Sequence, residues 1–277
     1  RLSTSSNNTA VGHYAASGST SGTRVIAVGG GTVSATNTGS FLVAIGHSAL
    51  GANTSGGYNV AVGDSALISN TTGASNVAVG HQSLDANTTA SNNTAVGYAS
   101  LGANTTGTQN AAVGAEALDA NTTGNTNAAL GIGSLGQNTT GDDNTAVGAF
   151  ALTANTTASN NTAIGKFALL ANTTGAFNTA VGALAGDAIT TGPYNTAFGY
   201  LALSTETAGQ ESVAIGSQAL ATQNTSGGGA IYNTAVGTSA GRLVTTGIEN
   251  TLIGGLAGDS ITTGDFNTAL GKGALST

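Results

Sequence analysis

Two short runs in the sequence have the spacing of enzyme motifs. The run G-I-G-S-L-G at residues 131–136 matches a dinucleotide-binding loop, and G-T-S-A-G at 237–241 matches a serine nucleophile elbow. A dinucleotide site needs a helix after the glycines, but a Q-N-T-T-G turn follows the first run. No histidine follows Ser239 to serve as its base. Both runs fall on ordinary positions of an internal repeat, so we predict no catalytic residue, no cofactor and no enzyme.

The histidines and carboxylates do not have the spacing of a metal site. His13, His47 and His81 each follow a repeat glycine, in alternate repeats. If the repeats stack like strands, these histidines lie about 9.6 Å apart. One ion with bonds of about 2.1 Å cannot bridge that distance. The carboxylates are scattered, and the one adjacent pair, Asp142 and Asp143, would point to opposite sides of a strand. We therefore predict surface histidines and no metal site.

The composition excludes several classes of partner. Only 6% of the residues are charged, and 5 basic residues face 12 acidic ones for a net charge of −7. Nucleic acids and anionic membranes are bound by clustered Lys and Arg, so neither is an expected partner. There is no cysteine. No apolar run approaches the about 18 residues that a membrane span needs, so we expect no direct membrane insertion of this segment.

One repeat runs through the chain. A hydrophobic pair followed by glycine recurs every 17 residues from Gly12 to Gly216, and again from Gly237 to Gly271. The consensus is N-T-A-V-G-x-x-A-L-x-A-N-T-T-G-x-x. We predict a single continuous repeat domain over residues 1–277, with a four-residue insertion between 216 and 237. Glycine and asparagine every few residues disfavour helices, and the short apolar runs favour strands. The expected fold is an all-β solenoid of about 16 coils, one 17-residue coil per repeat.

Asparagine occupies the position four residues before nearly every repeat glycine. Stacked amide side chains can hydrogen-bond from coil to coil, so we predict a structural ladder. The repeat glycine is expected to end each strand, and the T-T-G run to form the opposite turn. The predicted ladder comprises Asn59, Asn76, Asn93, Asn110, Asn127, Asn144, Asn161, Asn178 and Asn195.

The strands are apolar on both faces, which predicts association. Ala95 and Val96, like Ala146 and Val147, are neighbours that point to opposite sides of a strand. One side can line the inside of the coil, but a 17-residue coil is too small to cover the other. We therefore expect a second copy of the chain to cover it. The alternative is a monomeric, flattened solenoid with a small alanine-lined core.

Two features are candidate contacts for a ligand or partner. Aromatic residues recur five residues before the repeat glycine. Other coils have charged residues at this position, which indicates that it is exposed. The rings can stack on sugars, or they can pack locally over the preceding turn. The insertion, residues 224–232, is expected to leave the stack as a loop that is either a contact site or a neutral insertion. The candidate contact residues are Phe41, Tyr58, Phe177, Tyr194, Ile231 and Tyr232.

The repeat resembles that of a known family. The run S-V-A-I-G-S-Q-A at 212–219 is similar to the S/N-V-A-I-G-x-x-A repeat in the YadA-like head of trimeric autotransporter adhesins, as are L-V-A-I-G-H-S-A at 42–49 and N-V-A-V-G at 76–80. The likeness covers essentially the whole chain, although this repeat is longer than the usual head repeat. It implies a left-handed parallel β-roll, a homotrimer, an extracellular location, and a host-surface glycan or protein as partner. The longer N-T-A-V-G…N-T-T-G form also resembles repeats of phage tail-fibre-like proteins.

These observations together predict a non-enzymatic structural or adhesive fibre module on a cell surface or virion, in which three copies add avidity. One alternative is a fibre spacer with no ligand of its own. Another is a monomeric ice-binding solenoid, because threonine pairs such as Thr71–Thr72 and Thr105–Thr106 recur in the turns. Neighbouring residues of a strand point to opposite faces, which argues against a flat threonine array.

Overall fold

The computed structural model describes residues 4–225 and 227–276, and all regular structure within them is β. The chain forms two compact units, Arg1–Thr140 and Gly141–Thr277. Each unit is a parallel β-solenoid built from the 17-residue repeat. The predicted solenoid fold is therefore confirmed, with about 15 turns, close to the expected number. The single continuous domain stays a prediction.

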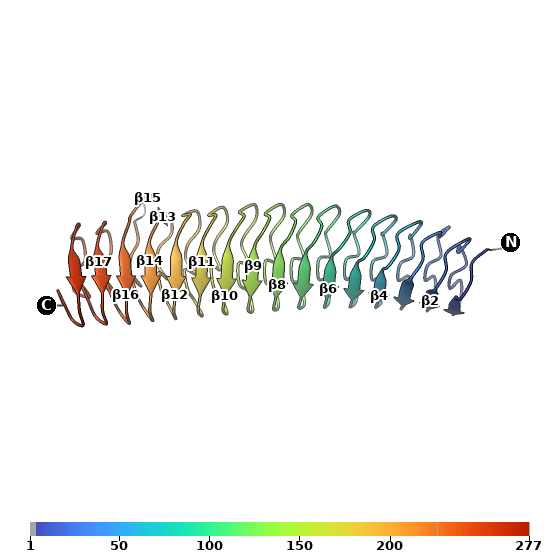
Figure 1. The fold of residues 1–277 in the computed structure, drawn as a ribbon, viewed down its shortest axis with the longest axis horizontal. Coiled ribbons are helices and arrows are strands. Elements are labelled where there is room, and N and C mark those ends of the chain that lie inside the picture. The colour runs from blue at the N-terminus through green and yellow to red at the C-terminus, as the bar shows by residue number, and fades with distance from the viewer. Residues whose placement is uncertain (1–3, 226, 277) are drawn as a thin grey trace. The chain divides into compact units, whose positions relative to one another are not determined.

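Each coil contributes one strand, and successive strands pair in parallel in chain order within each unit (Figure 1). The first unit holds β1 (Thr9–Val11), β2 (Val25–Val28), β3 (Leu42–Ile45), β4 (Val60–Val62), β5 (Val77–Val79), β6 (Thr94–Val96), β7 (Ala111–Val113) and β8 (Ala128–Leu130). The second unit holds β9 (Thr145–Val147), β10 (Thr162–Ile164), β11 (Thr179–Val181), β12 (Thr196–Phe198), β14 (Val213–Ile215), β16 (Thr234–Val236), β17 (Thr251–Ile253) and β18 (Thr268–Leu270), with a separate pair formed by β13 (Gly209–Gln210) and β15 (Gly229–Ala230). The register places equivalent residues side by side, as with Ala78 and Ala95.

The core of each coil is small and aliphatic. The middle residue of each strand, such as Ala95, points inward and is buried from Ala27 onward. A leucine four residues after the repeat glycine, such as Leu84 or Leu101, fills the rest of the interior and is also fully buried. The flanking strand residues, such as Thr94 and Val96, point outward and are only half-buried. The inner apolar face is therefore covered by the chain itself, and the outer one is not.

The predicted asparagine ladder forms, and it bonds mainly to backbone. The N–H of Asn76 donates to Oδ1 of Asn59 at 2.9 Å, and Nδ2 of Asn59 donates to the carbonyl of Gly73 at 2.8 Å. The same pair of bonds repeats through both units. A direct amide-to-amide bond of this column joins Asn127 to Asn110 at 3.2 Å. Each side chain thus ties the next coil to its own, because it satisfies that coil's backbone groups.

A second ladder lies at the position seven residues after the repeat glycine, where the sequence indicated only a turn. Nδ2 of Asn70 donates to Oδ1 of Asn53, and Nδ2 of Asn87 to Oδ1 of Asn70, both at 2.9 Å. These side chains are completely buried. Buried amides are tolerated when they are hydrogen-bonded, and wherever consecutive coils both have asparagine here, the stack supplies the same partner. The chain of amide-to-amide bonds expected for the first ladder is thus found in the second.

Some coils replace this ladder with a different packing. Where Gly186 stands in place of the core leucine, Ile189 stands in place of the ladder asparagine, and a Cβ at Gly186 would lie 3.0 Å from Cδ1 of Ile189. The isoleucine therefore fills the volume that the leucine leaves, as close packing requires. Gly241 with Val244 repeats the exchange. Because Ile189 offers no donor, the buried Oδ1 of Asn172 in the preceding coil has no hydrogen-bond partner among the described residues.

The insertion is only partly an outward loop. Gly227 and Gly228 are exposed, as predicted, while β15 pairs with β13 just after them. Ile231 is 2% exposed, and its N–H donates to the carbonyl of Gln210 at 3.0 Å. The prediction that Ile231 offers a contact surface is therefore wrong, because its side chain fills the stack. Ser226, in the same segment, lies outside the described residues.

A buried carboxylate holds the coil beneath the insertion. Glu206 is completely buried, and its Oε1 accepts bonds from the backbone N–H groups of Thr207, Ala208 and Gly209 at 2.9, 3.2 and 2.7 Å. Oε2 accepts from Nε2 of Gln223 at 3.1 Å and from the N–H and hydroxyl of Thr225, both at 3.2 Å. Six donors thus satisfy the carboxylate, and together they tie two coils and the start of the insertion to one another.

Replacing Glu206 with alanine should destabilise the second unit by about 3 kcal/mol or more, because buried N–H donors lose their acceptor. The matched control is Glu249→Gln, since Glu249 is exposed and its substitution should change the free energy of unfolding by less than about 0.5 kcal/mol. Urea denaturation followed by circular dichroism compares the two. Equal stability of the two variants would show that the Glu206 bonds do not hold this coil.

Candidate interaction surfaces

The first outward surface is the strand face, formed by the residues three and one before each repeat glycine. Its second column is Val, Ile, Leu or Phe in each repeat, with side chains such as Ile164 and Phe198 that are 40% and 53% exposed. Its first column is Thr, Val, Ile or Ala. Neither column contains a charged residue in any repeat. Each unit therefore carries a continuous, uncharged and largely apolar band along its sheet.

The second surface is the aromatic column, five residues before each repeat glycine, which borders the strand face. Phe41 stacks on Tyr58 with ring centroids 4.6 Å apart and planes 9° apart, and Phe177 stacks on Tyr194 at 5.1 Å and 5°. The guanidinium of Arg24 lies 4.8 Å from the Phe41 ring centroid. All four rings are exposed, as their column predicted. Because the rings stack on one another and Arg24 lies over Phe41, a ligand can reach only the ring edges and the ring faces that remain uncovered.

The backbone of the aromatic column is left-handed. Phe41 and Tyr58 both have a φ of +59°, and residues at this position keep that conformation through both units. Residues other than Gly and Asn adopt this backbone conformation at a cost of about 1 kcal/mol. The inter-coil bonds of the neighbouring asparagine ladder hold it in place. This conformation lets the residue five before the glycine and the ladder asparagine that follows it point to opposite sides of the coil wall.

Tyr232 ends the insertion and belongs to the same column. Its ring is 55% exposed, in contrast to the buried Ile231 beside it. A hydrogen bond to the Glu211 side chain, together with the negative charge of that carboxylate, raises the pKa of Tyr232 above its usual value. The nearby Glu249 acts in the same direction. Tyr232 therefore remains a candidate contact residue, with its hydroxyl directed to the preceding coil.

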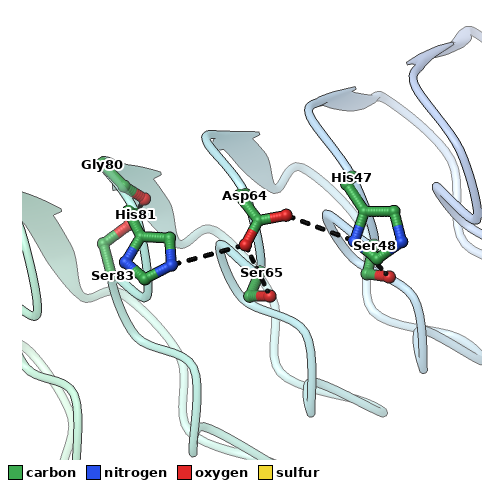
Figure 2. Close-up of polar contacts among 7 residues, drawn as sticks. All are labelled: His47, Ser48, Asp64, Ser65, Gly80, His81 and Ser83. Atoms are coloured by element: carbon green, nitrogen blue, oxygen red, sulfur yellow. Dashed lines mark hydrogen bonds and ion pairs between the residues drawn. The ribbon is translucent and has the colours of Figure 1, made fainter.

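The third surface is the histidine column, directly after each repeat glycine. Nδ1 of His47 lies 3.2 Å from Oδ1 of Asp64, and Nε2 of His81 lies 3.4 Å from Oδ2 of the same carboxylate, as Figure 2 shows. The ring of Tyr98 stacks on His81 with centroids 5.8 Å apart. The histidines are exposed, as predicted, but the contacts of Asp64 with both of them were not predicted. No group of three or more potential metal ligands occurs among the described residues.

Three half-buried carboxyls lie five residues after a repeat glycine. Burial raises the pKa of Asp85, Asp119 and Asp187 above the usual value for aspartate. The negative charges of Glu116 and Asp85 raise that of Asp119 further. Asp85 and Asp119 lie two coils apart, on either side of Gly102. They repel each other across that glycine.

The two enzyme-like runs form ordinary turns of the stack. Ser134 in the first is completely buried, and its hydroxyl donates to the carbonyl of Gly131 at 2.8 Å. Ser239 in the second is 8% exposed, and its N–H donates to the carbonyl of Ser217 at 2.8 Å. Both runs are thus ordinary turn segments of the repeat.

Comparison of the chain with family models, with curated proteins and with solved structures found no match. Within the described residues, no helix has the length and hydrophobicity to cross a bilayer.

Proposed function

We propose that this chain is a non-enzymatic fibre module that assembles as a homotrimer and acts in attachment outside the cell, on a cell surface or a virion fibre. The observation that supports it most directly is the strand face. In both units the band is apolar or threonine-bearing at each coil, carries no charge, and is left uncovered by the chain. Contiguous apolar surface of this kind marks an interaction site.

The partner that fits the strand face best is another copy of the same chain. Burial of apolar area contributes about 25 cal/mol per Å², so a band that extends over many coils provides a large driving force. A parallel copy has the same coil spacing, and its strand face meets this one without a charge on either side. Identical surfaces that meet around an axis give a closed assembly. The resemblance to trimeric adhesin heads favours three copies.

In such an assembly the aromatic column borders the interface and is repeated in each copy. Exposed rings such as Tyr58 and Tyr194, and the single Tyr232, offer weak contacts to a host-surface glycan or protein. Three copies raise the strength of attachment through effective concentration. Glycan-array and cell-binding measurements on the trimer distinguish an adhesive module from a spacer, which would bind neither.

Light scattering should give a mass about three times the 26.3 kDa of one chain. The Val147→Asp variant should keep its fold but dissociate, because Val147 lies on the strand face and a charge there would be buried between copies. Asn160→Asp adds the same charge on the exposed aromatic column and should remain trimeric. A folded wild-type chain that stays at 26.3 kDa at all concentrations would rule out the trimer.

A further inference from the structure

A fourth outward surface recurs in the turn that follows the core leucine of each coil. It is formed by the residues six, eight and nine after each repeat glycine, and we name it the threonine face. Position six is most often alanine, and positions eight and nine are threonine in most coils. Consecutive examples are residues 86, 88 and 89, then 103, 105 and 106, then 120, 122 and 123 in the first unit, and 154, 156 and 157, then 171, 173 and 174, then 188, 190 and 191 in the second.

Both threonines of each pair lie outside the core. Thr106 is exposed and Thr105 is half-buried, while Asn104 before them and Gly107 after them are buried. Residues 105 and 106 form a bend rather than a strand, so the rule that neighbouring strand residues point to opposite faces does not apply to this segment. The objection to a threonine array assumed a strand at this position, and the structure has none there.

Hydrogen bonds fix the first threonine of each pair. The hydroxyl of Thr105 donates to the carbonyl of Thr122 at 3.1 Å, and that of Thr122 donates to the carbonyl of Thr139 at 3.0 Å. The second unit repeats the bond from Thr173 to Thr190 at 3.1 Å. The hydroxyl and methyl groups of threonine are both set by the one torsion χ1, so a hydrogen-bonded hydroxyl also holds the methyl group in one orientation. Little conformational entropy remains to be lost when this surface binds.

The second threonine of each pair offers an open hydroxyl. Thr89 and Thr106 are exposed, and their hydroxyls have no hydrogen-bond partner within the described part of the chain. Hydrogen-bonded coils repeat at about 4.8 Å, so these hydroxyls form a row at that spacing. The six, eight and nine positions contain no charged residue from the coil of Gly46 to the coil of Gly254. The threonine face is thus a repeating, uncharged array of hydroxyls and small apolar groups.

We propose that the threonine face binds ice. A surface that repeats at a fixed short interval matches a partner that repeats in the same way, and the hydroxyl spacing is close to the oxygen repeat of the ice lattice. Ordered methyl groups and hydroxyls hold water in a lattice-like arrangement, whereas a charged side chain would impose its own hydration shell. The proposal goes beyond attachment through the strand face and aromatic column, and it holds for a monomer or a trimer.

The test is thermal hysteresis and inhibition of ice recrystallisation by the full chain. The wild-type chain should hold ice crystals without growth below their melting point. The double variant Thr89→Lys/Thr106→Lys should lose most of this activity, because two long charged side chains disrupt the array in adjacent coils. Both residues are exposed, so circular dichroism and thermal unfolding should show that the variant remains folded.

Gln109→Lys is the matched control, since Gln109 lies in the same coil as Thr106 but on the exposed aromatic column. This variant should keep the wild-type hysteresis. A wild-type chain that leaves ice growth unchanged overturns the proposal, and so does a Thr89→Lys/Thr106→Lys variant with full activity. Equal loss in the Gln109→Lys control would also overturn it, because the effect would then follow charge rather than the threonine face. None of these outcomes depends on the oligomeric state.

Discussion

Replacing Gly97 with alanine should destabilise the first unit by about 4 kcal/mol or more, enough to prevent a marginally stable unit from folding. A Cβ at this position would lie 2.4 Å from the carbonyl oxygen of Gly114 and 2.6 Å from its carbonyl carbon. Both atoms belong to the backbone of the next coil, which cannot move without breaking the register of the stack. The φ of Gly97 is also +137°, a conformation that L-residues rarely adopt.

The chain provides a control that separates these two effects. Gly271 occupies the same repeat position with a φ of +117°, but a Cβ added there would have no other atom within 4 Å. Gly271→Ala should therefore carry only the conformational cost, about 1–3 kcal/mol. Urea denaturation followed by circular dichroism measures both variants. If they lost the same stability, close approach between coils would not be the reason for glycine at this position.

Ala146→Asp should abolish folding of the second unit. Ala146 is completely buried on the inner side of β9, where it pairs in register with Ala163 of β10. An aspartate there would place an unpaired carboxylate among aliphatic side chains. A typical substitution lowers the free energy of unfolding by about 1 kcal/mol, and this one should lower it several times more. Resistance to proteolysis and the far-ultraviolet circular dichroism spectrum report whether the unit still folds.

The neighbouring residue gives the contrast for this experiment. Val147 follows Ala146 in β9 but points outward and is only half-buried, so its substitution by aspartate should leave a folded chain. Two adjacent positions with the same new charge thus test the two sides of one strand. Wild-type stability of the Ala146→Asp variant would contradict the assignment of the alanine column to the core.

The period, the strands and the repeated glycine could be predicted from the sequence alone. Each coil places equivalent residues in equivalent surroundings, so a requirement at one position appears in all copies. The repeat therefore predicts the positions of the alanine before Val96, the glycine after it and Asn93. The same logic predicted the exposure of Phe41 and Tyr58, because charged residues share their column.

Which turn residues face inward depends on how the coils fold and pack, and the sequence did not show it. Asn53 and Asn70 lie in segments whose sequence is typical of an exposed turn, yet they form a buried ladder. The direction of their side chains depends on how the turn folds over the core leucine. Ile231 looked like the end of a loop but fills the stack.

The other contacts that the sequence did not predict join residues from different coils. Asp64 meets His47 and His81 because stacking aligns positions one coil apart, and Glu206 meets Thr225 across the insertion. Periodicity shows which residues share a column, but the direction of a side chain depends on backbone torsions and on packing against the next coil. The repeat in the sequence therefore determined the stack, while packing between coils decided what each turn buries and what it leaves exposed.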